Sequence, residues 1–199
     1  MSGAEPRNPG REVILQTLER HRVEYVVIGG AAAQSRGWQG QTFDIDLTPE
    51  RSQENLARLA GALQELGAGF RVDPQRYPDG FRPPGGLDWR TFRNQIAVTF
   101  GTPHGDLDVV LLPDGTRGYE QIIATASRER ITGTDVTVPV ASAEMILRSK
   151  DAADRPKDRE TLPELREILD PLSPRAGHEP WSPRAGHERP RDGHEPPER

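Results

Sequence analysis

The sequence has no cysteine and no long hydrophobic run. Without thiols the chain can form neither disulfides nor thiolate metal sites, so a bound metal would depend on oxygen and nitrogen ligands. The apolar stretches stay below the roughly 18 residues that a membrane-spanning helix needs. Residues 1–10 are polar and contain two prolines, which is not the pattern of a signal peptide. We therefore expect a cytoplasmic protein that does not enter a membrane.

Apolar residues are scarce, and the shortage is concentrated at the C-terminal end. Only 33% of the 199 residues are hydrophobic, and beyond Leu172 the single large apolar side chain is Trp181. The eight residues from Ser173 recur almost unchanged from Ser182. A repetitive polar segment buries too little surface to offset the entropy of ordering it. We expect 171–199 to be a disordered tail.

Positive charge is also in short supply, because the formal net charge is −5. An acidic domain is not an obvious binder of nucleic acid, since phosphate contacts need local positive charge. Two stretches are nevertheless locally basic, 70–94 and 148–159, and the first interleaves arginines with aromatic residues. Such a combination could hold an RNA end. The alternative is a surface loop whose aromatic side chains pack against the core.

The rest of the chain alternates between the two regular periodicities. Helical spacing occurs near 11–22, 31–37, 53–66, 119–126, 142–147 and 157–169. Strand patterns occur at 24–28, 43–47, 95–100 and 107–112, with a hairpin over 128–140 and a Pro- and Gly-rich loop over 73–90. The alternation predicts an α/β (α+β) domain with a mixed β-sheet flanked by helices. We expect a core over 1–140 and a small C-terminal helical unit over 141–170 packed on it.

The most informative segment is Thr42-Phe43-Asp44-Ile45-Asp46. In a strand alternate residues face the same side, so Asp44 and Asp46 would point together while Phe43, Ile45 and Leu47 point to the core. Two carboxylates on one face repel each other unless a cation lies between them.

Asp108 lies on a later predicted strand, where Leu107 and Val109 would face the core and the acids the other way. If the two strands are neighbours, Asp108 completes a cluster of three carboxylates. That arrangement suits magnesium-dependent phosphoryl transfer. Taken alone, an Asp-x-Asp pattern is often a turn, a solvated strand face or a calcium ligand.

A glycine pair, Gly29-Gly30, follows the predicted strand 24–28 and precedes a helix. Glycines there let the backbone approach a phosphate closely, and the helix start adds amide donors. A tight turn is the alternative interpretation. The combination of glycine pair, Asp-x-Asp strand and later aspartate is more specific than any of its parts.

Three motifs together resemble the polymerase-β-type nucleotidyltransferase superfamily: residues 25–30, 42–46 and 107–108. Within it, the chain is most similar to the AbiEii-like and MenT-like nucleotidyltransferase toxins of toxin–antitoxin systems. A further similarity lies in residues 147–158, where such proteins carry an active-site Lys on a helix, then an Arg and a Lys-Asp pair. The resemblance covers about residues 11–169.

The resemblance implies a site that transfers a nucleoside monophosphate from an NTP, with Mg²⁺ or Mn²⁺ as cofactor. It implies metal ligation by Asp44, Asp46 and Asp108, catalytic roles for these and for Lys150 and Asp158, and nucleotide contacts by Gly29, Gly30, Arg36, Thr42 and Arg155. Lys150 would bind phosphate, although a lysine at a helix end is more generally a solvated charge. Asp158 would position Lys150 or Arg155. Many relatives have a basic residue at the position of Gly40, a role that Arg36 could take.

The acceptor is left open by the sequence. The toxin resemblance implies RNA, such as the tRNA 3′ end, and a cognate antitoxin protein as partner. An alternative is nucleotidylation of a protein or a small molecule, such as an antibiotic. A third possibility is a non-catalytic relative that binds a nucleotide or a partner protein.

Overall fold

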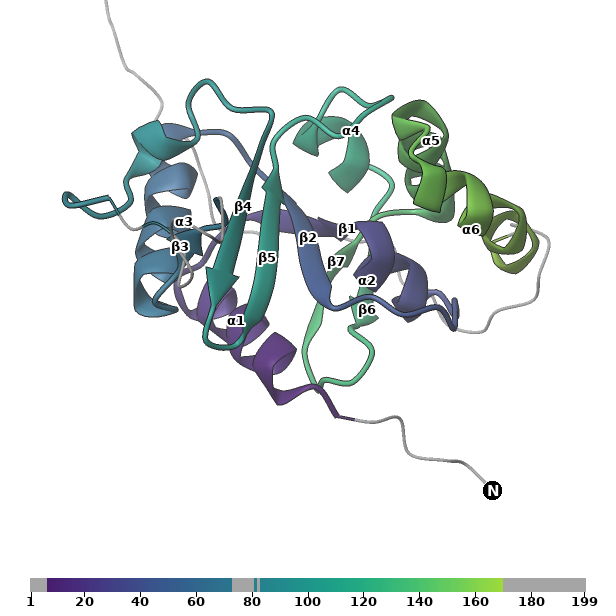
Figure 1. Ribbon diagram of the computed structural model, residues 1–199, viewed down its shortest axis with the longest axis horizontal. Coiled ribbons are helices and arrows are strands. Elements are labelled where there is room, and N and C mark those ends of the chain that lie inside the picture. The colour runs from purple at the N-terminus through teal and green to yellow at the C-terminus, as the bar shows by residue number, and fades with distance from the viewer. Residues whose placement is uncertain (1–6, 73–80, 82, 170–199) are drawn as a thin grey trace, which may run out of the picture.

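The computed structural model describes residues 7–72, 81 and 83–169. It contains a seven-stranded mixed sheet in the order β3-β4-β5-β2-β1-β7-β6, with helices on either side (Figure 1). The predicted fold class is therefore confirmed. The expected disordered tail, 171–199, lies outside the described residues. Within the part described, no helix has the length and apolar character needed to cross a bilayer.

The elements follow the predicted order. The strands are β1 (Tyr25–Ile28), β2 (Asp44–Pro49), β3 (Gly69–Phe70), β4 (Ala97–Thr102), β5 (Gly105–Val110), β6 (Ser127–Arg130) and β7 (Thr137–Val140). The helices are α1 (Pro9–Arg20), α2 (Gly29–Ser35), α3 (Gln53–Glu65), α4 (Tyr119–Ile123), α5 (Ala143–Ala153) and α6 (Pro156–Ile168), with a short 3-10 turn, η1 (Trp89–Thr91).

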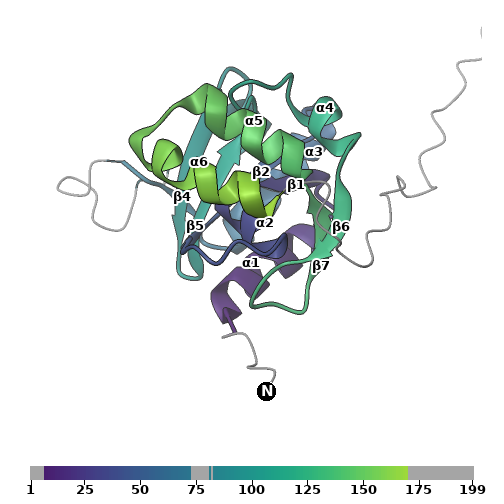
Figure 2. The ribbon, with the colours of Figure 1, turned by 90° about the vertical axis from the view of Figure 1, so that its right-hand side faces the viewer.

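Strand β2 is the centre of the sheet. It pairs antiparallel with β1 and parallel with β5. Alternate residues of β2 and β5 are fully buried, among them Leu47, Leu107 and Val109. Helix α1 packs against α3 and contacts β5, whereas α5 packs against α6 and α2. The pairs α1–α3 and α5–α6 consequently lie at different sides of the sheet (Figures 1 and 2).

One side chain departs from the predicted alternation. Ile45 and Leu47 are buried as expected, but Phe43 is 82% exposed. The prediction for Phe43 is wrong because β2 begins only at Asp44. Outside the hydrogen-bonded ladder, the pleat no longer imposes the side on which a residue points.

The hairpin of β4 and β5 is tighter than its sequence suggests. Both strands extend two residues further into the expected turn, which leaves only Pro103 and His104 between them. Thr102 supports this turn through its hydroxyl, which donates to the carbonyl of Gly105 at 2.8 Å and accepts from the amide of His104 at 3.0 Å. Gly105 has φ of 127°, a conformation that glycine adopts readily.

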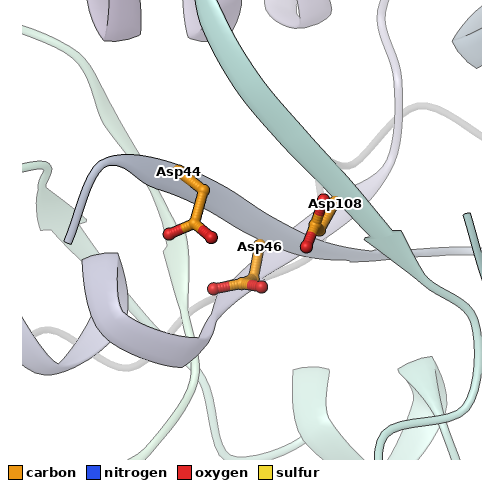
Figure 3. A group of neighbouring side chains, drawn as sticks. All are labelled: Asp44, Asp46 and Asp108. Atoms are coloured by element: carbon orange, nitrogen blue, oxygen red, sulfur yellow. The ribbon is translucent and has the colours of Figure 1, made fainter. Parts of the chain in front are cut away.

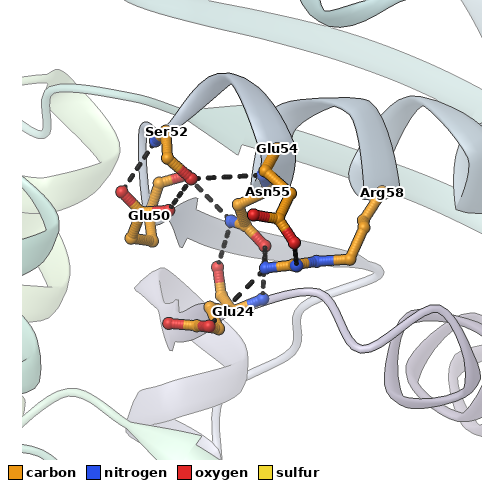
Figure 4. Close-up of polar contacts among 6 residues, drawn as sticks. All are labelled: Glu24, Glu50, Ser52, Glu54, Asn55 and Arg58. Atoms are coloured by element: carbon orange, nitrogen blue, oxygen red, sulfur yellow. Dashed lines mark hydrogen bonds and ion pairs between the residues drawn. The ribbon is translucent and has the colours of Figure 1, made fainter. Parts of the chain in front are cut away.

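A polar cluster fixes the end of the sheet away from the aspartates (Figure 4). Ser52 caps α3 by accepting from the amide of Asn55 at 3.2 Å. The fully buried Asn55 accepts from the amide of Glu24 at 2.7 Å and donates to the carbonyls of Glu24 and Glu50, both at 2.8 Å. One side chain thereby joins the start of β1, the end of β2 and α3.

The aromatic residues of 70–94 that the structure describes serve mainly in packing. Phe92 is completely buried, and Phe70 stacks on Phe81 and Phe100 with centroids 6.3 and 5.2 Å away. Trp89 carries the guanidinium of Arg90 over its ring at 4.9 Å. The packing interpretation of this stretch holds for these residues, whereas 73–80 and 82 lie outside the described part.

Candidate metal centre and nucleotide pocket

The register of two strands brings the three predicted aspartates together. Asp46 of β2 lies directly opposite Asp108 of β5 in a parallel pair, and Asp44 is two residues earlier on the same face. Carboxylate oxygens of all three lie within 4.8 Å of one another. The side chains converge on one space (Figure 3). The expected three-carboxylate cluster is therefore present.

The carboxylates of this cluster have perturbed pKa values. Burial, reinforced by the charges of Asp44 and Asp108, raises the pKa of Asp46 from 3.8 to about 7. The pKa of Asp108 is also raised, first by burial and then by Asp44. Carboxylates are placed so close together when a cation offsets their repulsion.

The donor set fits a hard divalent cation such as Mg²⁺ or Mn²⁺. Carboxylate oxygens are the ligands that these ions prefer. Asp108 supplies a second indication, because its Oδ1 is buried and finds no hydrogen-bond partner among the described residues. Buried polar atoms are almost always satisfied, so an unpaired carboxylate oxygen facing two other acids is a free ligand position.

The glycine pair and Thr42 contact the aspartates directly. A Cβ on Gly29, which has φ of 64°, would come within 2.1 Å of Oδ2 of Asp46, and a Cβ on Gly30 within 2.6 Å of the Thr42 hydroxyl. The backbone of Gly30 hydrogen-bonds Asp46, and the Thr42 hydroxyl donates to Asp44 at 2.7 Å. These residues thus support the carboxylates directly, whatever they contribute to a phosphate.

The opposite wall is positively charged and comes from α5 and α6. Lys150 donates to Asp158 at 2.8 Å, and the side chain of Asp158 is only 4% exposed. Of the two partners expected for Asp158, its side chain is thus paired with Lys150. The positive charge of Lys157 acts on both Asp46 and Asp108. No described residue forms a hydrogen bond or ion pair with the Lys157 ammonium group.

A sharp corner sets the direction of this wall. α5 ends at Ala153 and is capped by Asp154, which has the left-handed φ of 47°, and α6 begins at Pro156. Arg159 closes the corner with two hydrogen bonds to the Asp154 carboxylate, at 2.6 and 2.7 Å. The corner turns the first residues of α6, Lys157 and Asp158, toward the aspartates.

Between the two walls lies a cavity of about 280 Å³. Most predicted site residues line it, together with apolar side chains from β5, α4 and α5: Gly29, Gly30, Thr42, Asp44, Asp46, Asp108, Lys150, Arg155, Asp158, Val110, Ile122, Met145 and Ile146. Arg155 stands near Asp114, 3.8 Å between Nη2 and Oδ2. The cavity thus combines acidic, basic and apolar surfaces, as a nucleotide needs.

Arg36 is not brought to this cavity. Its Nε donates to the carbonyl of Ala141 at 2.7 Å and its Nη2 to the hydroxyl of Ser127 at 2.8 Å. Glu129 lies 3.6 Å from its Nη1. The guanidinium therefore joins the end of α2 to β6 and β7, and the structure does not place it where it could replace the basic residue missing at Gly40.

Gly40 itself has a packing role. A Cβ there would meet the indole of Trp38 at 1.9 Å, so this position admits no side chain while Trp38 stays in place. The Trp38 ring lines the cavity, and its Nε1 donates to Glu164 of α6 at 3.2 Å. Trp38 and Lys157 were not among the predicted site residues. Lys157 belongs to the quoted motif at 147–158, whereas Trp38 carries no sequence signal.

No family model and no curated protein matches the sequence. Solved structures do share its fold. The lincomycin-bound crystal structure of the lincosamide antibiotic adenylyltransferase LnuA aligns with a TM-score of 0.54 at 15% identity, over 82% of this chain and 99% of that one. The antibiotic-resistance factor ANT(2'')-Ia aligns with a TM-score of 0.50 at 16% identity, over 81% and 83%. At such identities the likeness establishes a nucleotidyltransferase fold.

Proposed function

We propose that the chain is a metal-dependent nucleotidyltransferase that transfers a nucleoside monophosphate from an NTP to a hydroxyl of an acceptor. The main support for this proposal is the cluster of Asp44, Asp46 and Asp108, which includes an unpaired buried oxygen. The cluster faces a cationic wall across a cavity whose acidic, basic and apolar surfaces complement a nucleotide. The shared fold supports this proposal.

The three aspartates would hold the divalent cation. When bound, such a cation lowers the pKa of an attacking hydroxyl and neutralises phosphate charge. The acceptor hydroxyl gives up its proton to solvent and its oxygen forms a bond to the α-phosphorus. The bond between the α-phosphorus and the oxygen shared with the β-phosphate breaks, and pyrophosphate leaves with that oxygen. The chain's own contribution is to align these groups and to balance the negative charge of the leaving pyrophosphate.

The two lysines would divide this work. Lys150 already shares a hydrogen bond with the buried Asp158, so its charge is largely balanced and its position is fixed. Lys157 is exposed, lines the cavity and acts on the aspartates through space. We assign the leaving pyrophosphate to Lys157 and an orienting contact with the triphosphate to Lys150.

For the acceptor, the described surface favours a small hydroxylated molecule. Two exposed arginines of 148–159 already bind groups of the chain itself: Arg148 donates to the carbonyl of Gly115 at 2.6 Å, and Arg159 binds Asp154. Arg90 and Arg93 lie over Trp89. These groups are less available to an RNA backbone, which needs several free cations. The bound lincomycin of LnuA is consistent with a small acceptor.

RNA acceptors, a cognate antitoxin and the AbiEii-like and MenT-like similarity stay predictions. One experiment distinguishes the acceptor classes. Each α-labelled NTP is incubated with the protein, Mg²⁺ or Mn²⁺, and separately with hydroxylated antibiotics, total RNA including tRNA, or a protein extract. We expect a labelled small molecule. Labelled RNA, or a labelled protein band, would instead identify the other acceptor class.

A matched pair of variants tests the metal assignment. Asp46→Asn removes one member of the cluster, whereas Asp106→Asn changes an acid of the same face that pairs with Arg71 at 3.1 Å. Labelling should disappear in the first variant and persist in the second. If wild-type protein transfers no label and nucleotides only raise its melting temperature, the non-catalytic alternative is correct.

A further inference from the structure

A buried arginine lies behind the metal centre. Arg11 belongs to the first turn of α1, far from the motifs, and only 5% of its surface is exposed. Taking a guanidinium out of water is unfavourable unless it is paired and hydrogen-bonded. The hydrogen bonds that Arg11 makes therefore indicate its role.

Those contacts converge on the segment that leads into β2. Nη2 of Arg11 donates to the carbonyl of Thr42 at 3.1 Å, and Nη1 donates to Oε1 of Gln34 at 3.0 Å. Gln34 in turn donates from Nε2 to the carbonyl of Gly40 at 2.8 Å. Arg11 and Gln34 thus hold two carbonyls of one short segment, 40–42.

Segment 40–42 ends at Thr42, which contacts the metal centre. The Thr42 hydroxyl donates to Oδ1 of Asp44 at 2.7 Å. Residues 36–43 are neither helix nor strand and include two glycines, Gly37 with φ of 99° and Gly40. A segment of this kind has high conformational freedom, so the place of Thr42 and Asp44 depends on what anchors it.

The charge of Arg11 also faces the site. Burial lowers the pKa of Arg11, while the charge of Asp44 acts in the opposite direction. Its Nε is buried and finds no acceptor among the described residues. Its hydrogen-bond acceptors are neutral: one amide oxygen and the carbonyls of Thr42 and Thr132.

We propose that Arg11 is a positioning residue of the metal centre, which with Gln34 fixes segment 40–42 and thereby holds Thr42 and Asp44 toward the other two aspartates. The inference rests on the proposed function for its consequence in catalysis. Its structural part, the ordering of 40–44, stands independently of any transfer reaction.

Arg36 offers a matched control. It is also a largely buried arginine that donates to backbone carbonyls, but it joins α2 to β6 and β7 and does not line the cavity. Arg11→Lys and Arg36→Lys each keep a positive charge and lose a forked donor. Both should melt at a lower temperature than the wild type.

Hydrogen exchange and metal binding separate the two variants. In Arg11→Lys the amides of 40–44 should exchange at least about tenfold faster than in Arg36→Lys, and Mn²⁺ measured by electron paramagnetic resonance should bind about tenfold more weakly, an energy of about 1.4 kcal/mol. Equal exchange and equal Mn²⁺ affinity in both variants would overturn the proposal, as would a uniform increase in exchange across the whole protein.

Gln34→Glu provides a second variant should Arg11→Lys not fold. It keeps the buried cation and an acceptor for it but removes the donor to the Gly40 carbonyl. Exchange at 40–42 should rise in this variant too, and unchanged exchange there would count against the proposal. Because the exchange measurement needs neither NTP nor acceptor, its outcome differs from failure of the proposed function, which is absence of transfer by the wild-type protein.

Discussion

The two walls of the cavity differ in the secondary structure that places their charged side chains. The acidic wall comes from β2 and β5, whose hydrogen-bonded register fixes Asp46 opposite Asp108. The cationic wall comes from α5 and α6. A hydrogen bond to Asp158 holds Lys150, whereas Lys157 is placed by the corner between the two helices. The comparison teaches that the negative charge of the site is placed by backbone pairing between strands, whereas its positive charge is placed by the packing and side-chain contacts of two helices.

The largest expected effect comes from breaking the acidic wall. Asp46→Asn should reduce transfer at least about a thousandfold, or about 4 kcal/mol of transition-state stabilisation, because a ligand of the cation is lost. Single-turnover assays with labelled NTP measure it. Asp106→Asn serves as the control, and comparable loss in that variant would contradict the assignment.

Removing Lys150, the partly buried lysine of the cationic wall, should cost stability. Lys150→Met leaves Asp158 buried and without its partner, which should lower the free energy of unfolding by about 3 kcal/mol. Urea denaturation measures the change. In the double variant Lys150→Met/Asp158→Leu much of the loss should return, and failure to regain stability would mean that the ion pair is not the cause.

The acidic wall should also show itself through pH. The pKa of Asp46 is about 7 in the folded protein against 3.8 ordinarily, so between these values the folded state retains a proton that the unfolded state has lost. The metal-free free energy of unfolding should therefore fall as pH rises, by about 2 kcal/mol from pH 5 to pH 7, and level off above pH 7.

Urea denaturation across this pH range, with and without Mg²⁺, measures the effect. Mg²⁺ should stabilise the protein increasingly toward pH 7, because it binds the ionised cluster. Asp46→Asn should lack most of the slope. An equally steep decline in that variant would show that another group is responsible.

The smallest effect sharpens the comparison within the cationic wall. Lys157→Gln should lower transfer about tenfold, about 1.4 kcal/mol, while the free energy of unfolding stays unchanged, since no described residue pairs with its ammonium group. Lys150→Met, in contrast, should lower the free energy of unfolding. Steady-state kinetics and denaturation on both variants check this, and a large stability loss in Lys157→Gln would refute the division of labour.

The acidic wall could be predicted from the sequence because it depends on local periodicity. The period of two put Asp44 and Asp46 on one face, and the same pattern recurs at Asp108. The sequence did not tell which strands pair, since β5 lies beside β2 with β3 and β4 intervening in the chain. Phe43 shows the limit of the pattern, because it precedes the first residue of β2 and the alternation holds only within the hydrogen-bonded ladder.

The arginines show what periodicity cannot reach. Arg36 follows the glycine pair closely and was expected at the nucleotide, but α2 directs it to β6 and β7. Arg11 is distant in the chain from every motif, yet its guanidinium lies behind Asp44. The positions of both arginines depend on the packing of α1 and α2 on the sheet, which is a long-range property of the fold.

The corner between α5 and α6 has a consequence for how this protein can change. A helix rotates about 100° for each residue, so one residue inserted or deleted after Asp154 would swing both Lys157 and Asp158 away from the aspartates together. Substitutions in the cavity can change its ligand preference one residue at a time. The number of residues between α5 and α6, however, has to stay the same. Lys150 would lose its buried partner and the pyrophosphate its counter-charge in the same event.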